Sequence, residues 1–142
     1  MANGTQAPSG WQDDLAVGID AVDGEHRLQV RLVDALEAAV RAGRGRGIVA
    51  EILQRLEETT RVHFLGEELL MRLHSYERQG PHAEEHRQLM EQLRALRELE
   101  PSAGERALAE PIERIRAWLT GHIRGADRAF AEAIAPPDRR PS

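Results

Sequence analysis

Histidines and carboxylates recur along this chain at spacings that suit metal binding. The candidate ligands, in chain order, are His26, His63, Glu67, His82, His86, His122 and Asp127. Residues four apart on an α-helix project from one face, so His63 with Glu67 could reach one centre, as could His82 with His86. A structural zinc ion takes four ligands and a catalytic zinc ion three. Seven ligands therefore fit a pair of metal ions better, and two irons bridged by the carboxylates would use them all.

Counting coordination places supports two irons and leaves one place free. Five histidines supply five bonds, two bridging carboxylates supply four, and a bridging oxide or hydroxide supplies two. Two octahedral ions offer twelve places, so one remains for a small ligand such as dioxygen. The same donors also suit manganese, so the ligand chemistry alone leaves the choice of metal open.

One spacing does not fit a regular helix. His122 and Asp127 are five residues apart, which is about 140° around an ideal α-helix and too far for a common centre. A local π-bulge would bring both side chains to one side, and Gly125 between them lowers the cost of that distortion. The sequence therefore predicts a π-bulge between these two ligands.

The apolar pattern predicts four helices that position the ligands. Apolar residues recur at intervals of three and four within residues 28–40, 48–70, 82–96 and 108–130. These stripes place Leu28, Ile48 and Leu70 on the same faces as the core and ligand residues. Turn-forming residues at 43–47, 76–81 and 101–104 separate the helices, and such short connections favour antiparallel neighbours. Pro111 is expected in the first turn of the last helix or at a bend, because an interior proline removes a backbone hydrogen bond.

The turns also place the histidines at a common height. His26 and His63 lie 18 and 19 residues from the middle of the first turn, and His82 and His122 each lie 20 residues from the middle of the third. Positions at equal distances from a turn are level in antiparallel helices. The sixth histidine, His74, falls beyond this level, where an interaction with a helix terminus is expected instead.

Length and composition predict one helical domain. The chain has 142 residues, enough for a single core without disulfides. We predict an all-α, antiparallel up-down-up-down four-helix bundle with an N-terminal extended arm. The expected division is a flexible tail at 1–10, the di-iron bundle at 11–134 and a second flexible tail at 135–142.

Charge and residue usage exclude several classes of function. The formal net charge of -5 argues against a general nucleic-acid binder, which needs a concentrated basic face. No apolar run approaches the roughly 20 residues of a membrane span, and the first residues do not resemble a signal peptide. The chain has no cysteine, which agrees with a cytoplasmic location and removes thiolate chemistry.

One rival motif shares two of the ligands. His82, Glu85 and His86 match the H-x-x-E-H pattern of inverted zinc peptidases. That motif leaves three histidines unused, so we favour the paired-metal interpretation.

The ligand residues and their neighbours resemble those of the hemerythrins, most closely the single-domain bacterial ones, from Trp11 to about Ile134. The matching motifs are Trp11 with Val17-Gly18-Ile19-Asp20 before His26; His63-Phe64 with Glu67-Glu68 and Met71; Tyr76 before His82 and His86; and Trp118-Leu119 before His122-Ile123 and Asp127. The five-residue interval before the last aspartate is also the spacing in that family.

The resemblance implies an oxo- or hydroxo-bridged di-iron centre that binds dioxygen reversibly. It assigns His82, His86 and His122 to one iron and His26 and His63 to the other, with Glu67 and Asp127 as bridges. The vacant place then belongs to the iron with two histidines. Leu119 and Trp118 would line the dioxygen pocket. Glu68 would lie outside the ligand set, in solvent or against a ligand.

Two classes of function remain open. A binding protein would store, deliver or sense dioxygen, and a separate protein partner would receive the oxygen or the signal. A di-iron enzyme would act on peroxide, nitric oxide or an oxidisable substrate, and would favour a more carboxylate-rich site with a nearby proton donor. Five histidines with two carboxylates favour the binding protein.

Overall fold

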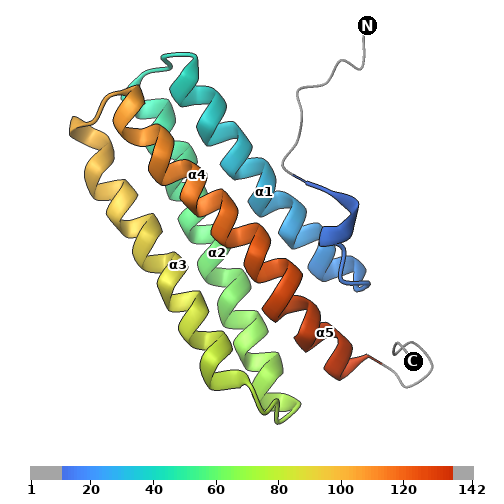
Figure 1. Ribbon diagram of the computed structural model, residues 1–142. Coiled ribbons are helices and arrows are strands. Elements are labelled where there is room, and N and C mark those ends of the chain that lie inside the picture. The colour runs from blue at the N-terminus through green and yellow to red at the C-terminus, as the bar shows by residue number, and fades with distance from the viewer. Residues whose placement is uncertain (1–10, 136–142) are drawn as a thin grey trace, which may run out of the picture.

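The computed structural model describes residues 11–135 and shows four long helices side by side in a bundle (Figure 1). The elements are η1 (Asp13–Leu15), α1 (Asp20–Arg41), α2 (Arg46–Leu73), α3 (Gln79–Leu99), η2 (Glu100–Ser102), α4 (Glu105–His122), η3 (Ile123–Asp127) and α5 (Arg128–Ile134). Each long helix packs against the next, and α1 packs against α4 to close the bundle. The predicted all-α, up-down-up-down architecture is confirmed. The predicted tail at 1–10, and all of the predicted tail at 135–142 except Ala135, lie outside the described residues.

The core consists of layers to which each long helix contributes one residue. Two such layers are Val33, Leu56, Leu93 and Ile115, followed by Leu36, Leu53, Leu96 and Ile112. Every member is at most 3 % exposed. Burial of side chains of this kind is worth about 1.5–3 kcal/mol each, so these layers supply much of the driving force for folding.

The buried face of α2 differs from the predicted stripe. Ile48 and Leu70 are 42 % and 40 % exposed, and Leu28 of α1 is 46 % exposed, so the prediction that they face the core is wrong. Val49 and Leu53 turn inward on α2 instead. The reason is that α2 also carries apolar residues on its outward face, so apolar spacing alone could not fix the rotation of this helix.

Pro111 lies deeper in α4 than the first turn. The helix begins at Glu105, because Gly104 precedes it in an extended conformation and its carbonyl accepts the amide protons of Ala107 and Leu108. Pro111 therefore falls in the second turn, and the expectation of a first-turn position is wrong. Helical structure continues past it to His122, which lies in the last turn of α4.

The N-terminal arm, residues 11–19, is attached to the bundle at both of its ends. Asp23 of α1 is buried and accepts hydrogen bonds from the amides of Val17, at 2.8 Å, and Gly18, at 3.3 Å. Gly18 adopts a φ of 92°, a conformation that favours glycine. Leu15 is fully buried in the core. No helix among residues 11–135 is long and apolar enough to cross a membrane.

The buried face of α2, which contains Leu53 and not Ile48, leads to a stability prediction. Leu53→Ala should lower the free energy of unfolding by about 2–5 kcal/mol, because it leaves a cavity in a buried layer. Ile48→Ala on the same helix should cost well under half as much, because Ile48 is partly in water. Urea unfolding of both variants measures the difference, and equal losses would contradict the observed rotation of α2.

Candidate metal centre

The structure brings all seven candidate ligands into one buried cluster. They come from every long helix and the turn after α4: His26 from α1, His63 and Glu67 from α2, His82 and His86 from α3, His122 from α4 and Asp127 from η3. Each is 0 to 7 % exposed. The imidazole rings of neighbouring helices pack edge to face, with ring centres 4.7 Å apart for His82 and His122 and 4.9 Å apart for His26 and His63. Five histidines and two carboxylates therefore share one site inside the bundle.

The cluster divides into two groups of potential metal donors. In each group, one donor atom per residue can be chosen so that all of them lie within 4.8 Å of one another. The larger group is Glu67, His82, His86, His122 and Asp127, and the smaller group is His26, His63, Glu67 and Asp127. Both carboxylates belong to both groups, so the arrangement has room for two cations with Glu67 and Asp127 between them.

Asp127 is the centre of the cluster. Its carboxylate oxygens lie 3.0 Å from the Nε2 atoms of His26, His82 and His122. These three histidines come from three different helices. One carboxylate therefore links α1, α3 and α4 at the same height in the bundle.

Several imidazole nitrogens in the cluster have no hydrogen bond. The Nε2 atoms of His26, His63, His86 and His122 are buried without a hydrogen-bond partner. Three of them lie close to a carboxylate, as His86 does at 2.9 Å from Glu67, but the angles do not suit hydrogen bonds. Unpaired buried polar atoms are costly in a protein core. Their convergence on shared carboxylates fits a metal ion, which would bind these lone pairs directly.

Electrostatics favour positive charge between the carboxylates. Burial acts to raise the pKa of Asp127, but interactions with His122, His26 and His82 hold it well below its ordinary value. Burial by itself would lower the pKa of His82, yet the carboxylates of Asp127 and Glu67 raise it to about 9. The site therefore stabilises a cation at this position, either a proton on imidazole or a metal ion.

Three glutamates hold the outer nitrogens of the histidine rings. Nδ1 of His86 lies 2.7 Å from Glu68, Nδ1 of His122 lies 2.7 Å from Glu85, and Nδ1 of His63 pairs with Glu25. Such contacts fix the ring orientation and the tautomer, so that Nε2 points inward, and they make the imidazole a stronger donor.

Sequence reasoning missed two of these three glutamates. Glu85 contacts a histidine on another helix, 37 residues away, and the contact of Glu25 spans 38 residues. No periodicity connects residues at such separations. Glu85 is also the glutamate of the rival zinc-peptidase motif, and here it faces His122. Of the two positions expected for Glu68, the structure shows the one against a candidate ligand, His86.

Aromatic side chains pack against two of the histidines. Phe64 stacks on His86 with ring centres 3.7 Å apart, and Trp118 stacks on His122 at 4.7 Å. Leu119 is buried in the apolar core one turn before His122. Apolar side chains therefore border the cluster beside His86 and His122.

The predicted π-bulge is present. Residues Ile123–Asp127 form a π-helical turn that brings Asp127 to the same side as His122. Gly125 is not essential for this geometry, because an added Cβ would meet no atom within 4 Å and its φ is not left-handed. The conformational freedom of glycine is therefore not what holds the turn in place.

The N-terminal arm braces this π turn. Arg124 binds Asp14 at 2.9 Å and Gln12 at 2.7 Å, and Arg128 donates to the backbone carbonyls of Asp14 and Ala16. Both arginines flank Asp127. The arm therefore constrains the segment that presents the central carboxylate.

Two surface pockets reach the cluster. A pocket of about 320 Å³ is lined by His63 together with Glu25, Glu58, Thr59 and Val62. A pocket of about 340 Å³ on another side includes His82 and Glu85 in its lining. Each of these pockets borders one donor group at a single histidine.

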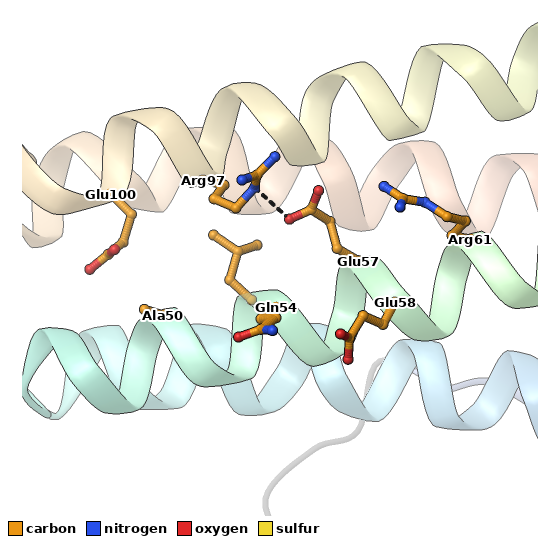
Figure 2. A pocket seen from close by; sticks show the side chains of 8 residues that line it. Ala50, Gln54, Glu57, Glu58, Arg61, Arg97 and Glu100 are labelled. Atoms are coloured by element: carbon orange, nitrogen blue, oxygen red, sulfur yellow. Dashed lines mark ion pairs between the residues drawn. The ribbon is translucent and has the colours of Figure 1, made fainter.

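A further cavity lies away from the seven residues, between α2 and α3. It has a volume of about 390 Å³ and is lined by Ala50, Leu53, Gln54, Glu57, Glu58, Arg61, Arg97 and Glu100. Figure 2 shows the ion pair of Arg97 with the buried Glu57, at 2.8 Å, inside this cavity. None of the seven clustered residues lines it. His74 follows the end of α2, is exposed and belongs to neither donor group.

Comparison with known proteins identifies the family to which this chain belongs. The hemerythrin HHE cation binding domain matches residues 17–134 of this chain. The chain belongs to the hemerythrin family. A bacteriohemerythrin of Stenotrophomonas maltophilia is 33 % identical over 124 residues, which cover 87 % of this chain and 80 % of the relative.

More distant hemerythrins also match along most of their length. A bacteriohemerythrin of Pseudomonas aeruginosa is 31 % identical over the same shares of both chains, and a hemerythrin-like protein of Naegleria gruberi is 26 % identical over 92 % of this chain and 97 % of its own. The match to the hemerythrin domain spans all seven clustered residues, and the name of that domain includes cation binding.

The π turn yields a test of how this hemerythrin presents Asp127. Inserting one alanine between Ala126 and Asp127 should carry Asp127 about 100° around the helix and away from the cluster, because a π turn absorbs one extra residue but not two. Metal uptake should then fall, because Asp127 belongs to both donor groups. Metal analysis after reconstitution measures the loss.

Two matched variants complete this test. Gly125→Ala changes the same turn without changing its length and should keep the metal content of the parent. Asp127→Asn should reproduce the loss without any change of backbone. Full metal content in the insertion variant would show that metal binding does not depend on how this turn presents Asp127.

Proposed function

We propose that this hemerythrin holds two iron ions in the seven-residue cluster and binds dioxygen reversibly, as a store, carrier or sensor. The observation that carries the proposal is the division into donor groups of five and four residues that share two carboxylates. Two separate mononuclear sites would not require shared residues. A di-iron centre bridged by Glu67 and Asp127 does.

The proposed ligand assignment follows the two groups. His82, His86 and His122 would hold one iron, His26 and His63 the other, and both carboxylates would bridge. The group with two histidines has one donor fewer, so the free place for an external ligand belongs to that side. When bound, two irons supply the two electrons that reversible uptake of dioxygen requires.

The surrounding residues have separate roles in the proposal. Glu25, Glu68 and Glu85 orient the histidine rings through Nδ1. Trp118 and Leu119 line the ligand pocket and keep outside water and protons away. A protein that only binds oxygen needs this exclusion, because water or a group acidic enough to transfer a proton to the ligand would favour irreversible chemistry.

Metal analysis with absorption spectroscopy tests the proposal. Protein produced with iron should contain two irons per chain. Air should produce a new visible absorption band in the reduced protein, and argon should remove it. A limit of one metal per chain, preferential retention of zinc, or catalytic consumption of peroxide or nitric oxide would overturn the oxygen-binding proposal.

The proposed position of Leu119 in the wall of the ligand pocket leads to a prediction about reversibility. Leu119→Ala should retain two irons but lose the reversible response to air and argon faster than the parent, because water enters the pocket. Repeated air and argon cycles followed by spectroscopy measure this rate.

Leu96→Ala is the matched control. It truncates a buried leucine in a layer remote from the cluster and should lower stability by about 2–5 kcal/mol. It should leave the cycling rate unchanged. The same rate of loss in the Leu119 variant and the parent would remove Leu119 from the pocket wall.

A further inference from the structure

The core layer next to the metal centre is half polar. It consists of Gln29, Thr60, Leu89 and Leu119, one residue from each long helix and one turn from His26, His63, His86 and His122 respectively. All four are at most 2 % exposed. The two leucines continue the aliphatic core, whereas the glutamine and the threonine interrupt it on the α1 and α2 side.

Gln29 and Thr60 lie opposite each other where α1 packs against α2. His26 and His63 face each other across this seam, and one turn further along Gln29 Nε2 donates to Thr60 Oγ1 at 3.3 Å. The next positions on both helices are aliphatic, beginning with Val33 and Leu56. Gln29 and Thr60 are therefore adjacent to the cluster rather than scattered polar residues of the bundle.

This pair is not fully satisfied by the protein. Gln29 is completely buried, and its Oε1 atom has no hydrogen-bond partner. A buried polar atom without a partner costs folding free energy, and an aliphatic pair of similar volume would avoid the cost. Stability alone therefore does not explain a glutamine at this position.

Gln29 and Thr60 also retain hydrogen-bond donors that no described protein atom uses. Thr60 Oγ1 accepts the bond from Gln29, so the threonine hydroxyl proton and the second amide proton of Gln29 remain to donate. The opposite orientation of the amide would leave both of its protons free. A helical side chain leans toward the N-terminus of its helix, which directs Gln29 toward His26.

The position of the pair matches the side of the cluster with fewer donors. The smaller donor group contains His26 and His63, and each of them lies one turn from a member of the pair. An external ligand at the free coordination place on that side would lie beside Gln29 and Thr60. The leucines at 89 and 119 occupy the α3 and α4 side of the same layer.

We infer that Gln29 and Thr60 form a polar subsite that donates a hydrogen bond to the small ligand bound on the His26 and His63 side. The subsite favours ligands with an accepting end, such as dioxygen or a small anion, over ligands that accept no hydrogen bond. The inference rests on the proposed two-metal function. It adds a specificity role that none of the seven clustered residues performs.

Azide binding to the oxidised, iron-loaded protein tests the subsite. Gln29→Leu and Thr60→Val remove the donors with little change of volume, and each should retain two irons while the azide dissociation constant rises about tenfold. Thr60→Ser keeps a hydroxyl and should bind azide nearly as the parent does. Leu93→Met, in the apolar layer beyond, is the packing control and should leave azide affinity unchanged.

Two further measurements separate hydrogen bonding from packing. The infrared stretch of bound azide should shift between H2O and D2O in the parent, and this shift should decrease in Gln29→Leu. Urea unfolding of the metal-free protein should show Gln29→Leu to be at least as stable as the parent, because the unpartnered oxygen is gone.

The outcomes distinguish this inference from the proposed function. Unchanged azide affinity and an unchanged isotope shift in iron-loaded Gln29→Leu and Thr60→Val would overturn the subsite while leaving the two-iron proposal standing. A parent that takes up no iron would overturn both. A parent that binds two irons and azide but does not respond reversibly to dioxygen would overturn only the oxygen-binding function.

Discussion

Two carboxylates buried at the centre of a helical bundle set the conditions for the rest of this structure. Glu67 and Asp127 are 6 % and 2 % exposed, and negative charge at such depth is unfavourable unless cations or hydrogen-bond donors surround it. Five imidazoles from four helices meet that requirement. The helices are therefore held in a register that suits the charges as well as the aliphatic core.

The placement of Asp127 depends on a local distortion with distant support. The π turn directs its carboxylate at three histidines, and Arg124 ties that turn to Asp14, 110 residues earlier in the chain. The arm fills a position in the apolar core with Leu15 and packs against the π turn that carries Asp127. It thereby stabilises a functional segment as well as the fold.

The two halves of the bundle differ in the kind of side chain that they bury. The layers toward the first and third turns are aliphatic and well buried, and they stabilise the fold through apolar contacts. The half of the bundle with the histidines contains unpaired ring nitrogens and the partly satisfied amide of Gln29. Unpaired buried polar atoms lower the free energy of unfolding, and binding a metal or a ligand to them restores it. The apolar layers keep the fold stable despite these unpaired atoms.

The sequence by itself determined the features that depend on local spacing. Four amphipathic helices, the shared faces of His63 with Glu67 and of His82 with His86, and the π turn all follow from intervals of a few residues. The tertiary structure decided how each helix is rotated and which long side chains meet across the seams. The exposure of Ile48, the contact of Glu85 with His122 and the pairing of Gln29 with Thr60 all belong to this second group. Helical periodicity relates residues within one turn or two, whereas these features depend on the packing of helices whose contacting residues are more than 30 positions apart.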